Sequence, residues 1–72
     1  MNLQYAKPGT SLTPREREVL TLVGKGFGYS EVARLLGISS DTVNEYMRRV
    51  CRRLEVNTRI EAAVLAAKQG WL

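Results

Sequence analysis

The most regular alternation of apolar and polar positions in the chain runs over residues 39–54. Apolar side chains recur there with the period of an α-helix and would share one face. They are Val43, Met47, Val50 and Leu54. The opposite face carries Asn44, Glu45, Arg48 and Arg52, with Arg49 and Arg53 at its edges. The pattern predicts an amphipathic helix that exposes arginines. Such a face suits either a solvated surface or a nucleic-acid groove, and the pattern alone leaves both open.

The first helix is predicted to begin directly after Thr13. Thr13 can cap it, Pro14 suits the first helical position, and Glu16 can close a capping box. The helix is expected to end at about Gly24 and Gly26. The residues expected to be buried are Val19, Leu20 and Val23, helped by Leu22, with Leu12 packed on the core ahead of the cap.

A short second helix is predicted over residues 28–36. Gly28 is a tolerable cap, and Glu31 preserves half of a capping box. The residues expected to face inward are Val32, Leu35 and Leu36. Gly37 can then adopt a positive φ, Ile38 fills the gap below the turn, and Ser39 caps the next helix. This spacing is that of a helix-turn-helix, although an ordinary corner between two helices shares it.

A fourth helix is predicted from the capping box of Thr58 and Glu61 to about residue 69, where Gly70 ends it. Trp71 and Leu72 are then expected to fold back as an apolar tail. The helix is apolar on two sides. One stripe is Ala62, Leu65 and Ala66, and the other is Ile60, Ala63, Val64 and Ala67. A helix of a small domain needs a single buried stripe, so the second stripe favours contact with another copy of the chain. The alternative is that the first and third helices cover both stripes.

Composition narrows the chemistry that the chain can perform. Its 72 residues carry a net charge of +4, which suits one small domain with an anionic partner. Because it has no histidine and a single cysteine, Cys51, no intrachain disulfide or cysteine zinc site can form. We expect no catalytic residue, no metal and no cofactor, and therefore no enzyme. The helical spacing places Cys51 in the core.

Neither a membrane-spanning apolar run nor a signal-peptide pattern is present, so we expect a soluble cytoplasmic protein that is associated with the nucleoid and makes no membrane contact. Residues 1–11 lack periodicity and contain Pro8-Gly9, which indicates a flexible tether or the remnant of a linker. Residues 12–72 are interpreted as the folded domain, whether the chain is complete or part of a larger regulator.

Several segments, taken in order, resemble one known family. They read LTPREREVLTLVGKG, EVARLLGIS, DTV, RRLEV, RIEA and GWL. Residues 12–72 resemble the LuxR-type (GerE-type) helix-turn-helix domain of bacterial transcription regulators. The resemblance implies an all-α, four-helix DNA-binding domain. Its helix-turn-helix would occupy about residues 28–54 and its dimerisation helix about residues 59–69. Such domains usually follow a response-regulator receiver or a small-molecule-binding domain.

The resemblance also implies roles for single residues. Positions that contact bases in the family fall on Asn44, Glu45 and Arg48. The positions that meet backbone phosphates fall on Ser40 and Thr42, and Arg59 matches an arginine at the start of the fourth helix. The family's dimer stripe falls on Ile60, Ala63, Val64 and Ala67. The implied partners are double-stranded DNA with a two-fold site and a second copy of the chain, with RNA polymerase as a further candidate.

The chain departs from the family at the start of its second helix. Gly28-Tyr29-Ser30 stands where Ser-Asn-Lys is usual, so a capping side chain and a phosphate-contacting lysine are missing. Tyr29 and Ser30 nevertheless belong to the expected DNA-binding set. In the third helix, Asn44 replaces the usual lysine and Tyr46 a frequent histidine. These departures predict an operator that differs from the family's common half-site.

Side-chain chemistry suggests what the third helix would read. Asn44 suits adenine and Arg48 suits guanine. Glu45 can accept from the amino group of cytosine or, alternatively, repel phosphate and act as a filter. The arginines that suit phosphates are Arg49, Arg52 and Arg53.

Two other interpretations stay open at this point. The segments LTPREREVL, GYSEVARLLGIS and DTV also resemble region four of sigma factors, which binds promoter DNA on RNA polymerase. The sequence beyond residue 56 argues against that module, which commonly ends soon after its recognition helix. A helical protein-interaction module that places its arginine face on an acidic partner is the second alternative.

Overall fold

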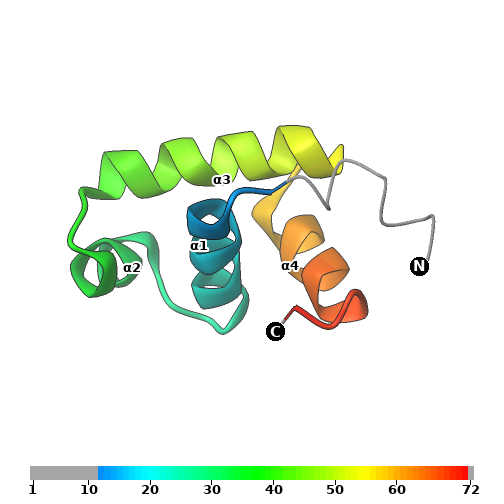
Figure 1. Ribbon diagram of the computed structural model, residues 1–72, viewed down its shortest axis with the longest axis horizontal. Coiled ribbons are helices and arrows are strands. Elements are labelled where there is room, and N and C mark those ends of the chain that lie inside the picture. The colour runs from blue at the N-terminus through cyan, green and yellow to red at the C-terminus, as the bar shows by residue number, and fades with distance from the viewer. Residues whose placement is uncertain (1–11, 72) are drawn as a thin grey trace.

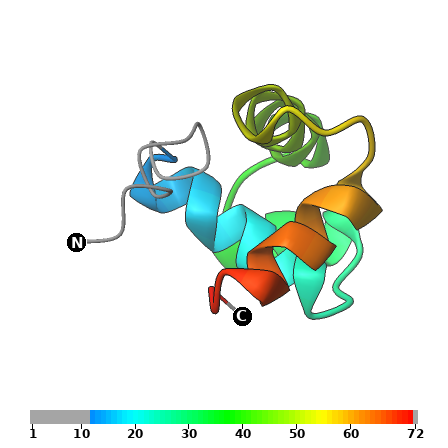
Figure 2. The ribbon, with the colours of Figure 1, turned by 90° about the vertical axis from the view of Figure 1, so that its right-hand side faces the viewer.

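The computed structural model describes residues 12–71, and every regular element among them is a helix. The helices are α1 (Pro14–Gly24), α2 (Tyr29–Leu36), α3 (Ser40–Leu54) and α4 (Arg59–Lys68). This confirms the all-α, four-helix fold. Figure 1 shows that α3, the longest helix, lies across the other three, and Figure 2 views it nearly end-on above them. The expected tether, residues 1–11, and the last residue of the apolar tail, Leu72, lie outside the described residues.

Capping boxes begin α1 and α4, as the sequence predicts. The Thr13 hydroxyl accepts a hydrogen bond from the Glu16 backbone N–H at 3.1 Å, and Glu16 Oε1 accepts one from the Thr13 N–H at 2.9 Å. Thr58 and Glu61 repeat the arrangement at 3.1 and 3.0 Å. Each box satisfies two backbone donors that a helix start leaves without partners.

The turn between α2 and α3 has the geometry that the sequence requires. Gly37 adopts a φ of 71°, a left-handed conformation that costs glycine little. The Ile38 N–H then donates to the Ala33 carbonyl at 2.9 Å, which closes the end of α2. Ser39 caps α3 through a hydrogen bond from the Thr42 N–H to its hydroxyl at 3.0 Å. The turn therefore fixes where α3 begins relative to α2.

A single core joins the four helices, and α3 supplies the largest share of it. The predicted stripe of α3 is buried throughout, as is Leu12 ahead of α1. The buried apolar residues are Leu12, Val19, Leu20, Val32, Ala33, Val43, Met47, Val50, Leu54, Ala62 and Ala66. The first stripe of α4 is thus confirmed at Ala62 and Ala66, while Leu65 packs half-buried at the edge.

The prediction for the inward face of α2 was wrong at Leu35, which is 58% exposed. The buried residues of this eight-residue helix are Val32 and Ala33, and Leu36 packs beside them. Residues 32, 33 and 36 cluster within about 100° around a helix, whereas residue 35 lies well outside that arc. Eight residues carry too little of the helical period to show that Leu35 lies outside the buried arc.

Among residues 12–71 one charged residue is buried, which the pattern did not predict. Glu16 is 2% exposed, and its carboxylate accepts the Thr13 N–H and lies 3.7 Å from Arg53 Nε. These contacts offset the loss of hydration that burial of a carboxylate imposes. They also tie the first turn of α1 to the last turn of α3, so the capping residue of one helix helps to position the other.

The end of the described chain folds back onto the core. Gly70 has a φ of 78°, and the half-buried Trp71 packs on the core with its ring centroid 5.0 Å from the Arg17 guanidinium carbon. This agrees with the predicted apolar tail. None of the helices between residues 12 and 71 combines the length and apolar character that a membrane span requires.

Candidate nucleic-acid interface

The outer face of α3 is polar and open to solvent. Asn44, Glu45 and Arg48 are all exposed, whereas Val43 and Val50 on the opposite face are 0% exposed. Packing therefore fixes the rotation of α3 about its axis, and the three side chains that the family resemblance assigns to base contacts share one exposed surface. They project from a braced helix and not from a loop.

Charge is distributed unevenly along this face. The first half of α3 carries the exposed acids Asp41 and Glu45, and the second half carries the exposed Arg48, Arg49 and Arg52. No ion pair within residues 12–71 involves either acid, nor Arg48 or Arg52. These charges are consequently not neutralised by the fold. The arginine end is suited to an anionic partner.

Two arginines of α3 have partners of their own. The Arg49 guanidinium carbon lies 5.8 Å from the centroid of the Tyr46 ring. Arg53 forms the ion pair with buried Glu16. This ion pair joins α3 to α1, and the phosphate contact expected of Arg53 stays a prediction.

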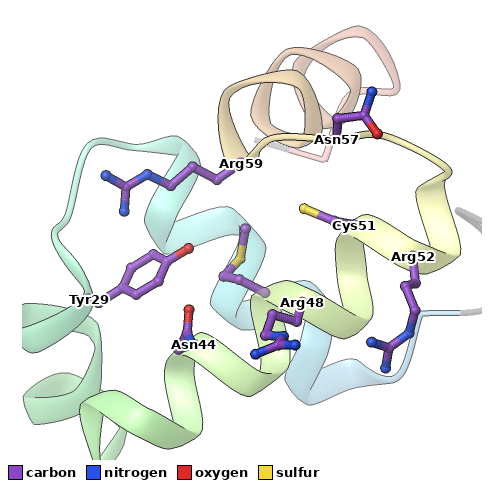
Figure 3. Close-up of a pocket in the computed structure, with 8 residues that line it drawn as sticks. Tyr29, Asn44, Arg48, Cys51, Arg52, Asn57 and Arg59 are labelled. Carbon is purple, nitrogen blue, oxygen red and sulfur yellow. The ribbon is translucent and has the colours of Figure 1, made fainter.

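A shallow hollow of about 500 Å³ opens beside the polar face, between α3 and the first residues of α2 and α4 (Figure 3). Three arginines and no acid are among the lining residues, which are Tyr29, Asn44, Met47, Arg48, Cys51, Arg52, Asn57 and Arg59. The structure therefore brings together five of the predicted DNA-binding residues (Tyr29, Asn44, Arg48, Arg52 and Arg59) from three helices. Such a basic concavity suits an anionic strand.

Arg59 and Tyr29 meet across this hollow. The guanidinium carbon of Arg59 lies 4.9 Å from the centroid of the Tyr29 ring, within the range of a cation–π contact. In Figure 3 the Arg59 side chain extends from the start of α4 toward the ring at the start of α2. The contact links two residues that are thirty positions apart in the sequence, and sequence periodicity gives no signal for it.

Three other predicted residues lie at helix starts. Ser30 and Ser40 are exposed in the first turns of α2 and α3. Thr42 is half-buried, and its hydroxyl lies 2.9 Å from the Ser39 hydroxyl. Neither Ser30 nor Ser40 lines the hollow beside Arg59.

Sequence reasoning missed Asn57 as a member of this surface. Asn57 lies in the turn before α4, and its backbone N–H donates to Glu61 Oε1 at 3.0 Å. Asn57 is also one of the residues that line the hollow. The signal in the sequence was its position one residue before the Thr58 cap, because backbone N–H groups at helix starts can bind anions.

Cys51 packs at the rim of the core and not inside it. It is half-buried and lines the hollow, with its sulfur directed into the space between α3 and α4 (Figure 3). Burial raises the pKa of the Cys51 thiol, and the charge of Glu61 adds to this effect. Within the described residues, no group of three histidine, cysteine or carboxylate side chains is placed to hold a metal ion.

The second apolar stripe of α4 is exposed. Ile60 is 73% and Val64 is 50% exposed, Ala67 is exposed, and Ala63 is half-buried. The alternative that other helices wrap both stripes is therefore wrong for residues 12–71. Phe27, in the turn before α2, is 38% exposed and lines a small hollow together with Ile60 and Ala63, so it extends the apolar surface of α4.

Comparison of the sequence with known proteins assigns the chain to a family. Residues 10–66 match the model of the bacterial regulatory proteins of the luxR family. The chain is 45% identical over 60 residues to the transcriptional regulatory protein DesR of Bacillus subtilis, covering 83% of this chain and 30% of that protein. It is 36% identical over 70 residues to DegU of Brevibacillus brevis, another transcriptional regulatory protein, covering 97% and 30% of the two chains.

A third relative is the nitrate/nitrite response regulator protein NarL of Escherichia coli, which is 38% identical over 53 residues, or 74% of this chain and 24% of that protein. The chain thus spans less than a third of the length of these relatives. The family match covers most of residues 12–71 and decides against the sigma-factor interpretation. The chain belongs to the luxR family of bacterial regulatory proteins, a family of DNA-binding transcription regulators and not of enzymes.

Proposed function

We propose that this domain binds double-stranded DNA in a sequence-specific manner, with α3 in the major groove. The observation that carries the proposal is the exposed polar face of α3, whose opposite face is buried in the core. Among residues 12–71, Arg48 and Arg52 of this face take part in no ion pair. A major groove admits an α-helix and offers a distinct pattern of donors and acceptors for each base pair. A helix whose rotation is fixed can present the same side chains to the same base edges.

Sequence discrimination is assigned to three residues of α3. Arg48 would donate two hydrogen bonds to guanine, and Asn44 would pair with adenine through its amide. Glu45 would accept from the amino group of cytosine, and its negative charge would disfavour positions where it approaches a phosphate. All three side chains are exposed on one face, which supports a shared role.

Affinity is assigned to residues around the base-reading set. The positive charge comes from Arg49, Arg52 and Arg59. Further members of the set lie at the starts of α2 and α3, namely Tyr29, Ser30, Ser40 and Thr42. Contacts to phosphates release counterions and so weaken as salt rises, without selecting a sequence. Their distribution over α2, α3 and α4 would hold α3 at one angle to the duplex.

We further propose that two copies pair through α4. The stripe of Ile60, Ala63, Val64 and Ala67 is apolar and exposed, and small alanines allow two helices to approach closely. An isologous contact of this kind would place two α3 helices about a two-fold axis, which matches an inverted repeat in DNA.

The domain is proposed to act as the output module of a longer, signal-responsive regulator in the bacterial cytoplasm. Its relatives DesR and DegU are transcriptional regulatory proteins, and NarL is a response regulator; the chain corresponds to less than a third of each. Residues 12–72 remain the predicted boundaries of this module, and contact with RNA polymerase remains a prediction.

Selection from random duplexes tests the function directly. The purified chain is incubated with a random DNA library at two salt concentrations, and the bound duplexes are sequenced. Enrichment of an inverted repeat is the expected result. A bound pool without sequence preference, together with loss of binding as salt rises, would reduce α3 to a non-specific cationic surface and contradict the proposal.

A further inference from the structure

The contact between Tyr29 and Arg59 lies at the edge of the core, against which the Tyr29 ring packs. Arg59 is exposed at the first position of α4, and Tyr29 is half-buried at the first position of α2. Their side chains meet over the hollow, with the guanidinium carbon 4.9 Å from the ring centroid. A core contact would bury both groups, whereas here the charged partner stays in solvent.

Stacking on an aromatic ring uses the face of a guanidinium and leaves its N–H donors, which lie in the plane, available. Within residues 12–71, Arg59 makes no ion pair. The nearby carboxylate of Glu61 is occupied instead by the backbone N–H groups of Asn57 and Thr58, each at 3.0 Å. Arg59 is thus oriented by Tyr29 but keeps its charge and its hydrogen-bond donors.

The surroundings of Arg59 define what it can bind. The hollow also receives Arg48 and Arg52 from α3, and no acidic side chain is among its lining residues. An open concavity lined by three arginines suits a phosphodiester group, which arginine can bind with two parallel hydrogen bonds. A phosphate placed there would lie beside the base-reading face of α3.

We infer that Tyr29 is a positioning residue, which holds Arg59 ready for a phosphate of the bound DNA strand in the hollow between α2, α3 and α4. The inference rests on the proposed DNA binding. Arginine loses considerable side-chain freedom when it is fixed on a ligand, and the stacked ring removes part of that freedom in advance. Positive charge at this end of α2 is then supplied from α4 by Arg59, since residue 30 is serine and carries none.

The test uses the full chain and a duplex obtained by the selection described above. Binding is measured over a series of salt concentrations for the parent chain, Tyr29→Phe, Tyr29→Leu, Arg59→Gln and the double variant Tyr29→Leu/Arg59→Gln. Tyr29→Phe is the conservative variant, which retains the ring over Arg59 and should therefore keep most of the affinity that Tyr29→Leu loses. Tyr29→Leu retains an apolar side chain without a π face and should bind about two- to five-fold more weakly. Thermal unfolding of each variant verifies that the fold is intact.

Coupling between the two residues is the decisive readout. Arg59→Gln should lower the slope of log affinity against log salt by about 0.9, the value for one phosphate contact. In that background, Tyr29→Leu should have no further effect on affinity, because the group that it positions is gone. Equal losses in both backgrounds, or a loss for Tyr29→Phe as large as that for Tyr29→Leu, would overturn the positioning role. If the parent chain selects no sequence, the proposed function itself fails.

Discussion

Helices α3 and α4 are built on the same plan but present opposite chemistry to solvent. Each buries one stripe in the common core: Val43, Met47, Val50 and Leu54 in α3, and Ala62 and Ala66 in α4. The outer face of α3 is charged and polar, while that of α4 is apolar, with Ile60 and Val64 at its centre. A charged exposed face is stable in water alone, whereas an apolar one of this kind indicates a protein partner.

This difference assigns separate tasks to two helices of one small domain. We propose that the buried stripes set stability, that the outer face of α3 sets DNA recognition, and that the outer face of α4 sets pairing. If the assignment is correct, substitutions on the three surfaces should affect three different measurements.

The largest effect is expected from the buried stripe of α3. Met47 is 2% exposed, so Met47→Ala should leave a cavity and lower the free energy of unfolding by about 2–5 kcal/mol. Ile60→Ala, at a 73% exposed apolar position of α4, should change it by less than about 0.5 kcal/mol. Urea unfolding of the two variants, at a protein concentration where the chain is monomeric, measures both free energies. A loss for Ile60→Ala comparable to that for Met47→Ala would mean that the outer stripe of α4 belongs to the core of the monomer.

The next effect concerns pairing through α4. Val64→Glu places a charge in the centre of the apolar stripe, so the variant should remain folded but bind an inverted repeat no more tightly than an isolated half-site. Leu35→Glu is the matched control, since Leu35 is an equally exposed apolar residue on α2, at 58% against 50% for Val64. Gel-shift titrations on full and half-sites compare the two variants. Cooperative binding of the full site by Val64→Glu would exclude α4 as the pairing surface.

A smaller, sequence-dependent effect is expected on α3. Arg48→Ala should weaken binding to the selected duplex by about 1–3 kcal/mol and binding to random DNA far less, because a bidentate contact to a base is lost. Arg15→Ala removes an arginine of α1 that pairs with Glu18 at 3.0 Å, away from the proposed interface, and should leave the preference between the two duplexes unchanged. Competition titrations measure the ratio of the affinity for the selected duplex to that for random DNA. Equal losses of Arg48→Ala on both duplexes would make Arg48 a phosphate contact.

Much of this architecture follows from local sequence patterns. The boxes of Thr13 with Glu16 and of Thr58 with Glu61 locate two helix starts, because the hydrogen bonds that define them join residues three positions apart. The stripe of α3 repeats over about three turns, so its period identifies the buried face without ambiguity. In contrast, α2 has eight residues, too few for the period to distinguish Ala33 from Leu35 as the inward residue.

Contacts between distant segments were not accessible in this way. Glu16 reads in the sequence as a capping residue, and nothing nearby indicates that it is buried against Arg53 from the end of α3. Likewise, Tyr29 and Arg59 each appear as the first residue of a helix, and only the packing of α2 and α4 under α3 brings the ring and the guanidinium together. Such pairs depend on how helices cross, which the periodicity of a single helix does not encode.

The smallest effect is expected at Cys51, on the side of α3 that faces the start of α4. Burial raises the pKa of this thiol above its ordinary value of 9.0, so the folded state holds its proton at a pH where the unfolded chain has lost it. Stability contributed by the neutral thiol should be complete below that value and decline as pH rises through it.

Urea unfolding of the parent chain and Cys51→Ala at about pH 7 and about pH 10 tests this, since the other titrating groups are common to both proteins. The stability of the parent relative to Cys51→Ala should be lower at the higher pH. An unchanged or larger difference would show that the thiol ionises as freely in the fold as in the unfolded chain, and that the hollow between α3 and α4 is more hydrated than the half-buried position of Cys51 indicates.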